Sequence, residues 1–445
     1  MKAAETQESN ILLKADFPFH SWYRFVLSYP PHLVRKYAEE FDLGPSDLLF
    51  DPFCGTGTTL VEGKILGIPS LGSEAHPFTA MVSRVKCNWS LNPGQMRKLA
   101  KASCDKAEQA CNKHGLPPLS FITQILRGPS PHRLNGYSLH PDETEMIPTG
   151  FMSDRPLGRL LILRHWIEKL TEEESTPVRE FFYVALAHVI SQGAGNFSFG
   201  PEIYKTKAKH DYDVLGHFAR QTEIMISDLE ASKSLAERKT RACVYEDDAR
   251  ELSKIPGGIT SVITSPPYPN EKDYTRTTRV ESVLLRFMSH RDELRGIKHS
   301  LLRSNTRNVF VADQDMNEIA AFDSIRKVCE QIENRRLELN KTSGFERLYH
   351  KVVAHYFGGM KKHFRKLKPK LQSGAKLAYV VGDQYSFLMV PVRTATLLAE
   401  VAESEGYRVN GIQLWRERVG TKVRNGHEEQ KIVRVREEVL MLETP

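Results

Sequence analysis

The chain has 445 residues, of which 40% are hydrophobic, enough to bury the core of about two or three domains. Its 62 Lys and Arg residues against 55 Asp and Glu residues give a net charge of +7, which permits a polyanionic partner without requiring one. No run approaches the ~18 apolar residues of a membrane helix, and the polar start "MKAAETQESN" lacks a signal-peptide core, so we expect a cytoplasmic protein. The six cysteines form no C-x-x-C pair and no Cys/His cluster with zinc spacing, so we expect reduced thiols and no metal site.

The first predicted unit is a strand, a helix and a second strand. A helix over residues 32–44, ended by Gly44-Pro45, precedes it. "DLLFDPF" then predicts a short buried strand, "GTGTT" a tight turn, "TLVEGKILG" a helix and "SLGSEA" the second strand. This order is typical of a parallel sheet whose two faces are covered by helices.

The middle of the chain has a different pattern. Between residue 91 and about residue 240 the apolar spacing is mainly helical, most clearly in "LGRLLILRHWIEKL" and "VREFFYVALAHVI". The glycine-rich aromatic segment "GAGNFSFGPE" at 193–202 predicts a loop, either one that lines a site or a plain connection. We therefore expect one large, mainly helical insertion.

Strand patterns resume at "RACVYEDD" and "GITSVITSPP", and a smaller helical stretch covers residues 279–345. A helix over 355–368, the strand "AKLAYVVGD", a further helix and the strands "RVNGIQLWRE" and "REEVLMLE" complete the chain. No helix separates the last two strands, so we expect them to pair antiparallel. The sequence thus predicts an α/β fold with a Rossmann-like sheet of about seven strands and helices on both faces.

The segment "DPFCGTGTT", residues 51–59, lies where the first strand gives way to a helix. In open α/β sheets, ligands bind beyond the carboxyl ends of strands, and Gly55 and Gly57 would let a ligand approach the backbone. Leu60 occupies the place of the third glycine of a dinucleotide fingerprint, which argues against a phosphate site. A tight turn without a ligand is the alternative.

Acidic residues follow the next two strands. Glu74 is placed to accept hydrogen bonds from ribose hydroxyls, although alone it would be an ordinary surface acid. Of Asp247 and Asp248, one should face the site and the other solvent, and Asp248 is our candidate acceptor for an adenine amino group. Together these strand ends fit an adenosine-containing ligand held without phosphate contacts.

The fourth strand ends in "TSPPY". Pro266 and Pro267 fix the backbone in a stiff extended turn, Ser265 adds a hydroxyl, and Tyr268 adds a face on which a base can stack. A planar nucleobase amine is a poor nucleophile because its lone pair is delocalised into the ring. A serine oxygen and a proline carbonyl that accept its two N–H bonds would favour a more tetrahedral nitrogen, so the work is mainly positioning.

"DPFCGTGTT" and "TSPPY" together resemble motifs I and IV of the S-adenosyl-L-methionine (AdoMet)-dependent amino-methyltransferases of DNA. On this resemblance Glu74 falls on motif II, Asp248 on motif III, "AYVVGD" on motif VI, and residues 19–34 on motif X, which packs around the methionine end of AdoMet. The resemblance implies catalytic roles for Ser265, Pro266, Pro267 and Tyr268. It implies contacts to the cofactor AdoMet from Asp51, Pro52, Phe53, Gly55, Gly57, Thr58, Glu74 and Asp248.

The function implied is methylation of the N4 amine of a cytosine flipped out of double-stranded DNA, in a prokaryotic modification or defence system that could include a cognate nuclease. Serine in first place of motif IV is commoner in N4-cytosine enzymes, but the order of motifs X, I, insertion, IV is that of the alpha arrangement. DNA N6-adenine methylation with the same machinery is the nearest alternative, and RNA methylation and a non-catalytic nucleic-acid-binding subunit are weaker ones. The recognition sequence and the oligomeric state are not indicated.

Phosphate contacts require lysine and arginine. Candidates are Arg276 and Arg279 after motif IV and Lys361, Lys362 and Arg365 in "MKKHFRKLKPK", although such a run is often only a solvated helix face. We expect the catalytic domain to comprise residues 1–90, 241–287 and 346–445. Two insertions interrupt it, at 91–240, which is the candidate target-recognition region, and at 288–345.

Overall fold

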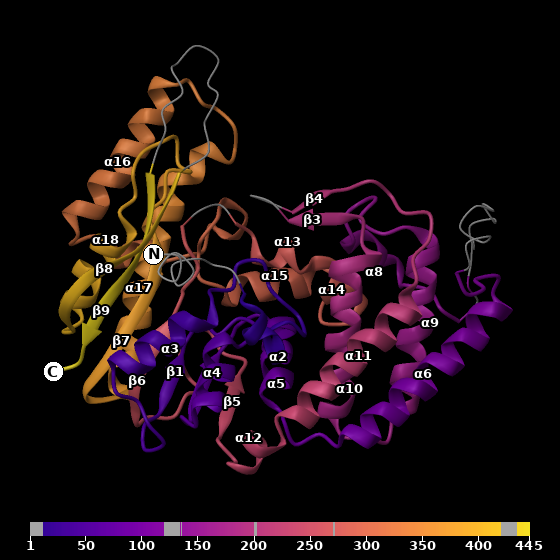
Figure 1. Ribbon diagram of the computed structural model, residues 1–445. Coiled ribbons are helices and arrows are strands. Elements are labelled where there is room, and N and C mark those ends of the chain that lie inside the picture. The colour runs from indigo at the N-terminus through magenta and orange to yellow at the C-terminus, as the bar shows by residue number, and fades with distance from the viewer. Residues whose placement is uncertain (1–11, 120–133, 135, 200–202, 270–271, 420–433) are drawn as a thin grey trace.

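The computed structural model describes residues 12–119, 134, 136–199, 203–269, 272–419 and 434–445 (Figure 1). A seven-stranded sheet has the order β5-β2-β1-β6-β7-β9-β8. Its strands are β1 (Leu49–Asp51), β2 (Ser70–Ser73), β5 (Ala242–Tyr245), β6 (Ile259–Thr264), β7 (Leu371–Gly382), β8 (Arg408–Val419) and β9 (Arg434–Glu443). The pairings are parallel except those of β9 with β7 and β8, so the α/β fold and the antiparallel last pair are confirmed.

Helices cover both faces of the sheet. Along β7, Ala378 and Val380 pack in the cluster that contains α3, whereas Leu377 and Tyr379 pack in the cluster that contains α17. This alternation follows from the two-residue period of a strand and explains why the predicted strands are almost entirely apolar. The covering helices are α3 (Pro31–Glu40), α4 (Thr58–Leu66), α5 (Pro77–Cys87), α17 (Tyr349–Leu367) and α18 (Thr394–Ser404).

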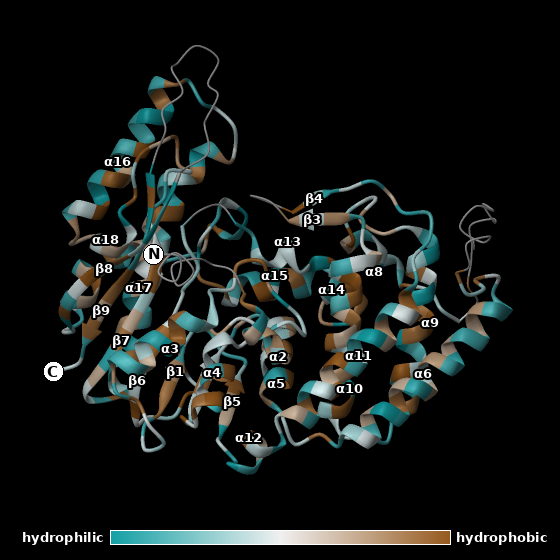
Figure 2. Cartoon of the chain, in the orientation of Figure 1, coloured by the Kyte–Doolittle hydropathy of each residue, from teal (hydrophilic) through white to brown (hydrophobic). Residues whose placement is uncertain are grey.

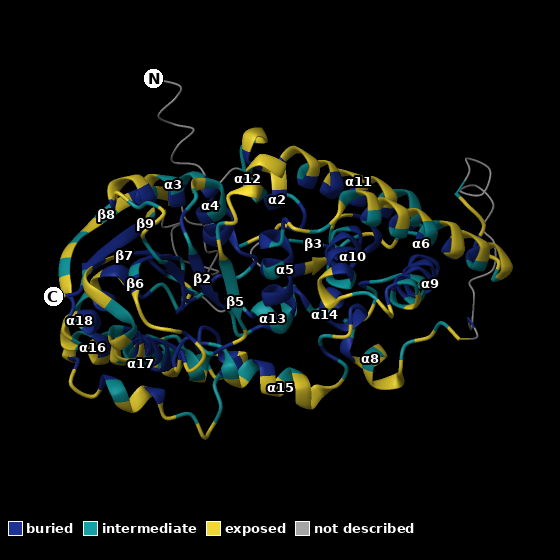
Figure 3. Cartoon of the chain, turned by 90° about the horizontal axis from the view of Figure 1, so that it is seen from below, coloured by how far each residue is buried: buried dark blue, intermediate teal, exposed yellow. Residues whose placement is uncertain are grey.

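A helical region lies beside the sheet, on the side of β5 (Figure 1). Its helices are α6 (Pro93–Lys113), α8 (Pro141–Met146), α9 (Asp154–Leu170), α10 (Thr176–Val189), α11 (Val214–Ala231) and α12 (Lys233–Glu237). α6 and α11 turn exposed faces outward (Figure 3), and brown apolar faces lie between neighbouring helices (Figure 2). No helix in the described ranges is long and apolar enough to cross a membrane.

The remaining helices are short or lie at the edges of the sheet. They are α2 (Phe17–His20), α13 (Tyr274–Thr277), α14 (Arg279–Leu284), α15 (Arg291–Ser300) and α16 (Asp323–Glu338). α13 and α14 directly follow the strand end of the "TSPPY" segment, and α16 packs on α17 through Ile325 and Ile332. These elements therefore frame one edge of the sheet.

The segment at 193–202 is not a plain loop. A π-helical turn continues α10 over Ile190–Ala194, and β3 (Phe197–Phe199) pairs antiparallel with β4 (Ile203–Lys205). The aromatic side chains Phe151 and Phe197 stack with ring centroids 5.6 Å apart, which gives the hairpin its own apolar contact. Residues 200–202 lie outside the described residues, and the described part of the segment does not line the cavity discussed below.

Candidate functional site

A cavity of about 770 Å³ opens at the carboxyl ends of the parallel strands. β1, β2 and β6 run in the same direction, so the residues that follow them meet at one edge of the sheet. The predicted residues that line the cavity are Pro52, Phe53, Gly55, Thr58, Glu74, Ser265, Pro266, Pro267 and Tyr268. The fold therefore brings the glycine turn, the acid of the second strand and the proline turn into one cavity.

The glycine turn needs both of its glycines, for different reasons. Gly57 has φ +88°, and a Cβ there would lie 2.5 Å from Oγ of Ser83 on α5. Gly55 has φ +52°, and a Cβ there would meet no described atom within 4 Å, so it would project into open space. L side chains rarely adopt such φ values. Gly57 thus allows α4 to pack on α5, and Gly55 keeps the cavity wall open.

Asp51 organises the turn from behind. Its carboxylate is fully buried and accepts hydrogen bonds from Oγ1 of Thr264 at 2.6 Å, Oγ1 of Thr59 at 2.7 Å and the N–H of Phe53 at 3.0 Å. The hydroxyl of Tyr29 donates to the same carboxylate at 3.2 Å. Asp51 does not line the cavity. Its hydrogen bonds instead connect the turn, β6 and the N-terminal segment, so it is a positioning residue.

Glu74 lies on the cavity wall with its carboxylate anchored to the backbone. Oε2 accepts from the N–H of Gly55 at 2.9 Å, and Oε1 accepts from the N–H of His76 at 2.8 Å. Burial raises the pKa of Glu74 to about 7, although the two N–H groups oppose the shift. A carboxylate that is oriented in this way can accept hydrogen bonds from a diol.

At the end of β5 the structure separates the two candidate aspartates. Asp247 lines the cavity, and its carboxylate accepts from the N–H of Lys254 at 2.7 Å and from Oγ of Ser253 at 3.1 Å. Asp248 pairs with Arg250, whose terminal nitrogen lies 2.6 Å from Oδ2 of Asp248. The cavity-facing aspartate is therefore Asp247, and a contact between Asp248 and a nucleobase stays a prediction.

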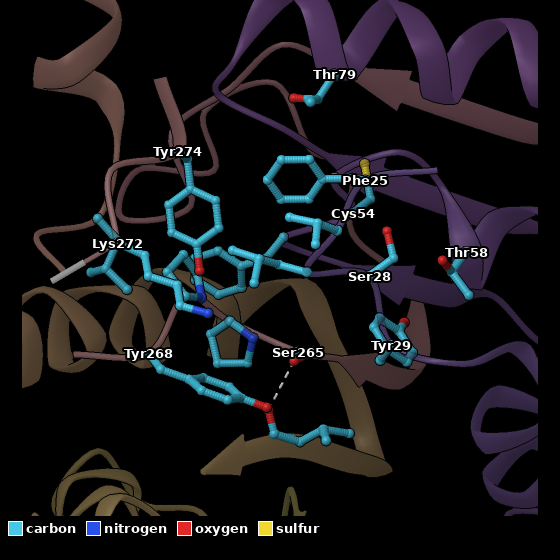
Figure 4. A pocket seen from close by; sticks show the side chains of 18 of the residues that line it. Phe25, Ser28, Tyr29, Cys54, Thr58, Thr79, Ser265, Tyr268, Lys272 and Tyr274 are labelled. Atoms are coloured by element: carbon cyan, nitrogen blue, oxygen red, sulfur yellow. Dashed lines mark hydrogen bonds between the residues drawn. The ribbon is translucent and has the colours of Figure 1, made fainter. Parts of the chain in front are cut away.

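The proline turn presents acceptors to the cavity. Neither Pro266 nor Pro267 has an N–H, so the main-chain groups that this turn offers are carbonyl oxygens. The hydroxyl of Ser265 donates to the carbonyl oxygen of Val380 on β7 at 3.1 Å. It also hydrogen-bonds with the hydroxyl of Tyr268 (Figure 4), and since the serine proton is engaged, the tyrosine is the donor in that pair. One acceptor position on Ser265 thus remains for a ligand.

The aromatic side chain of Tyr268 packs against the backbone of β7. A Cβ at Gly382 would lie 3.0 Å from Cε2 of Tyr268, so any larger residue there would press on the ring. Burial raises the pKa of Tyr268, which keeps the phenol protonated. Tyr274 and Lys272 lie beside it, and Ser28 and Tyr29 lie across the cavity (Figure 4).

The N-terminal segment forms a wall of the cavity, and its assignment to motif X stays a prediction. The residues of this segment that line the cavity are Phe25, Val26, Leu27, Ser28, Tyr29 and Leu33. Trp22 and Phe19 anchor the segment, because both are buried and the indole N–H of Trp22 donates to Asp228 of α11 at 2.7 Å. The predicted helix over 32–44 begins and ends a little earlier, at Pro31 and Glu40.

The arginines after motif IV do not line the cavity. Arg276 lies on α13 and Arg279 begins α14. The guanidinium of Arg279 donates to the carbonyl oxygen of Thr275 at 3.2 Å, and burial lowers its pKa, while the nearby Asp273 opposes this. A DNA contact from these two residues stays a prediction.

The basic run of α17 is paired with acidic residues. Nζ of Lys362 lies 2.6 Å from the carboxylate of Asp315. The guanidinium of Arg365 contacts Glu318 at 2.8 Å and Glu405 at 3.0 Å, and Nζ of Lys361 lies 3.7 Å from Glu318. These residues would have to exchange partners to bind phosphate, so their predicted role in binding DNA remains untested.

Several cavity residues were not expected from the sequence. Among them are His76, Lys272, Tyr274, Thr278, Trp415, Arg416, Arg418 and Glu437. The last four lie on β8 and β9, about 150 residues from motif IV along the chain. The alternating charges of "WRERV" indicate a strand with one charged face, but nothing local shows that this face meets the cavity.

Comparisons with known proteins agree with the motifs. The Type II methyltransferase M.BsoBI of Geobacillus stearothermophilus is 23% identical over 462 aligned positions, which cover 90% of this chain and 81% of the relative. M.MjaII of Methanocaldococcus jannaschii is 33% identical over 87 residues, or 19% of this chain and 15% of the relative. M.MvaI of Kocuria varians is 34% identical over 83 residues, or 17% of each chain. M.MjaII and M.MvaI are also Type II methyltransferases. The chain is thus similar to Type II methyltransferases, along most of its length in the first case and over short segments in the other two. No family model matches the chain.

Proposed function

We propose that the chain is a site-specific DNA methyltransferase that transfers a methyl group from AdoMet to the exocyclic N4 amine of a flipped cytosine. The observation that carries the proposal is that Glu74, the glycine turn and Ser265–Tyr268 line one cavity. Similarity to three Type II methyltransferases supports the reaction class. A place in a restriction-modification or defence system, with a cognate nuclease, belongs to the same proposal.

The side of the cavity formed by β1 and β2 fits AdoMet. Gly55 leaves open space over the turn, Glu74 offers a carboxylate to ribose hydroxyls, and Phe25 and Tyr29 supply an apolar wall for the methionine end. The cofactor supplies an electrophilic methyl group on a sulfonium centre. No phosphate-binding glycine is needed, in agreement with Leu60 at the third position of the turn.

The side formed by β6 fits the acceptor base. The free acceptor position of Ser265 and the carbonyl of Pro266 can take the two N–H bonds of an amine, and Tyr268 offers a ring on which the base stacks. Base–aromatic stacking contributes about 1–3 kcal/mol. An amine held in this way points its lone pair out of the acceptor plane, and no strong base is required.

DNA N6-adenine methylation is the second candidate. The adenine amine would meet the same acceptors, and the order of the motifs along the chain is that of the alpha arrangement. An RNA substrate is a weaker alternative.

The test is incubation with AdoMet and mixed genomic DNA, followed by mass spectrometry of the nucleosides. We expect N4-methylcytosine; N6-methyladenine would select the second candidate, and a product on RNA alone would refute both. Ser265→Ala and Tyr268→Ala should reduce transfer by about 100-fold or more with AdoMet binding nearly unchanged, because these residues face the acceptor.

Gly55→Val is the matched opposite, because it should abolish AdoMet binding first. Loss of AdoMet binding in folded Ser265→Ala or Tyr268→Ala protein would show that the two sides of the cavity are assigned wrongly.

A further inference from the structure

A charged wall of the cavity stands beside motif IV and has no role in the function proposed so far. Glu437 of β9 is in register with Gly382 of β7 on one side and with Arg416 of β8 on the other. Residues that are directly opposite in neighbouring strands project from the same face of the sheet. Since the missing Cβ of Gly382 points at the ring of Tyr268, Glu437 and Arg416 stand on the face that carries this ring.

The carboxylate of Glu437 orients two arginines. Oε2 lies 2.5 Å from Nε of Arg416, and Oε1 lies 2.7 Å from a terminal nitrogen of Arg418. The Glu437 side chain is 7% exposed and that of Arg416 is 18% exposed, whereas that of Arg418 is 49% exposed. The carboxylate therefore fixes Arg416 inside the cavity and leaves Arg418 at its rim.

The contact with Glu437 uses only the Nε position of Arg416. Within the ranges that the structure describes, no protein group accepts a hydrogen bond from its two terminal nitrogens. A β-bulge between Leu414 and Arg416 places Trp415 and Arg416 side by side on the cavity face, where Trp415 packs against α3. Bulges commonly redirect side chains next to active sites. The result is a rigid pair of N–H donors close to the amine acceptors of motif IV.

The edges of the two candidate bases differ beside the amine. In cytosine, N4 is followed by N3 and O2, two acceptors in a row. In adenine, N6 is followed by N1, an acceptor, and then by a C–H group. A guanidinium presents paired donors in a fixed fork, which matches two adjacent acceptors. Enzymes that flip a base read it along this same edge.

We infer that Arg416, positioned by Glu437, reads N3 and O2 of the flipped cytosine and selects it over adenine. The inference rests on the proposed function and makes it more specific. Adenine would leave one desolvated N–H of Arg416 opposite a C–H group, and a site built to hydrogen-bond a group discriminates strongly against a substrate that lacks it. Arg418, at the rim, is left to contact the DNA backbone.

The experiment measures single-turnover methylation at saturating AdoMet on two synthetic duplexes. Both duplexes carry the recognition site, which is first identified by sequencing DNA that the wild-type protein has methylated. One duplex has cytosine at the target position and the other has adenine. In both, the target base lies opposite an abasic nucleotide. We expect Arg416→Met to lower the cytosine-to-adenine rate ratio by about 10-fold to 100-fold, chiefly through the cytosine rate. Arg416→Lys, which keeps the charge beside Glu437 but not the fork, should lower it similarly.

Arg418→Met is the matched control on the same carboxylate. This variant should bind DNA more weakly and with a smaller dependence on salt concentration. Its cytosine-to-adenine rate ratio should be unchanged. Glu437→Gln should lower the ratio less than Arg416→Met, as expected for a positioning residue. An unchanged ratio in folded Arg416→Met and Arg416→Lys would overturn the inference alone. Wild-type protein that prefers adenine would overturn the inference and select the second candidate function. Wild-type protein that methylates no DNA would overturn the proposed function, and the inference with it.

Discussion

The carboxyl group of Glu74 shows how a single residue connects the fold to the chemistry. Two backbone N–H groups hold it at the end of β2, and burial raises its pKa to about 7. In the protein without ligand, burial disfavours the ionised form of Glu74 relative to the unfolded chain. The contribution of Glu74 to stability is therefore greatest below its ordinary pKa of 4.5 and declines as the pH rises towards 7.

Cofactor binding should show the opposite trend with pH. On the proposed function, ribose hydroxyls would donate to the carboxylate and AdoMet would favour ionised Glu74, so its affinity should fall by up to about 10-fold per pH unit below pH 7. Calorimetric titration between about pH 5.5 and 8.5 measures this dependence. Glu74→Gln should bind AdoMet weakly at all these pH values. A variant that kept the wild-type pH profile would show that another group is responsible.

At the scale of elements, a buried ionic network ties the candidate site to α17. Asp315 lies 2.8 Å from Arg250, which follows β5, and 2.6 Å from Lys362 on α17. Burial opposes its ionisation, but the hydrogen bond from Lys362 and the charge of Arg250 hold the pKa of Asp315 below its usual value. Asp315 therefore stabilises the fold above the usual carboxyl pKa, and this stabilisation is lost as the pH falls.

Removing the charge of Asp315 should destabilise the protein. Asp315→Asn leaves Arg250 and Lys362 without their shared carboxylate, which should cost about 3 kcal/mol of unfolding free energy at pH 7. Urea denaturation measures the loss, and the difference from wild type should shrink in acid. Asp323→Asn, at an exposed ion pair with Arg326, is the control and should leave the urea midpoint unchanged. Equal effects of the two variants would contradict a structural role for the network.

At the scale of the whole molecule, the helical insertion shares one hydrophobic core with the helices that cover the sheet. A single cluster joins Trp22 of the N-terminal segment, Val61 and Phe78 of the helices beside the sheet, and Phe181 and Phe218 of the insertion. The rings of Trp22 and Phe181 meet edge to face at 5.7 Å. The expected boundary at residues 90 and 91 thus has continuous packing across it, and target recognition by 91–240 remains a proposal.

A core that spans both parts predicts cooperative unfolding. Phe181→Ala should cost about 3–5 kcal/mol and reduce hydrogen-exchange protection in α4 and β1 as well as in the insertion. Leu337→Ala, at a side chain 57% exposed on α16, should have little effect. Two separate unfolding transitions, with only the insertion affected, would show that the insertion is an independent unit.

Local patterns in the sequence were enough to predict the sheet and those site residues that are neighbours along the chain. The period of two along β7, the glycines before α4 and the prolines after β6 each act on their own backbone, so "DPFCGTGTT" and "TSPPY" could be assigned directly. The parallel order of the strands then places these segments at one edge. The α/β fold and most of the cavity follow from these local patterns together with the parallel order of the strands.

Only the tertiary structure decided which charged residues face the cavity. Asp247 and Asp248 are indistinguishable by pattern. In the structure Asp247 lines the cavity, whereas Asp248 pairs with Arg250, which is held in turn by Asp315. The pairing of Lys362 with Asp315, and of Arg416 with Glu437, likewise joins segments distant in the chain or strands whose register the sequence does not show. Electrostatic partners are chosen by distance in space, and that distance is set by packing rather than by local propensity.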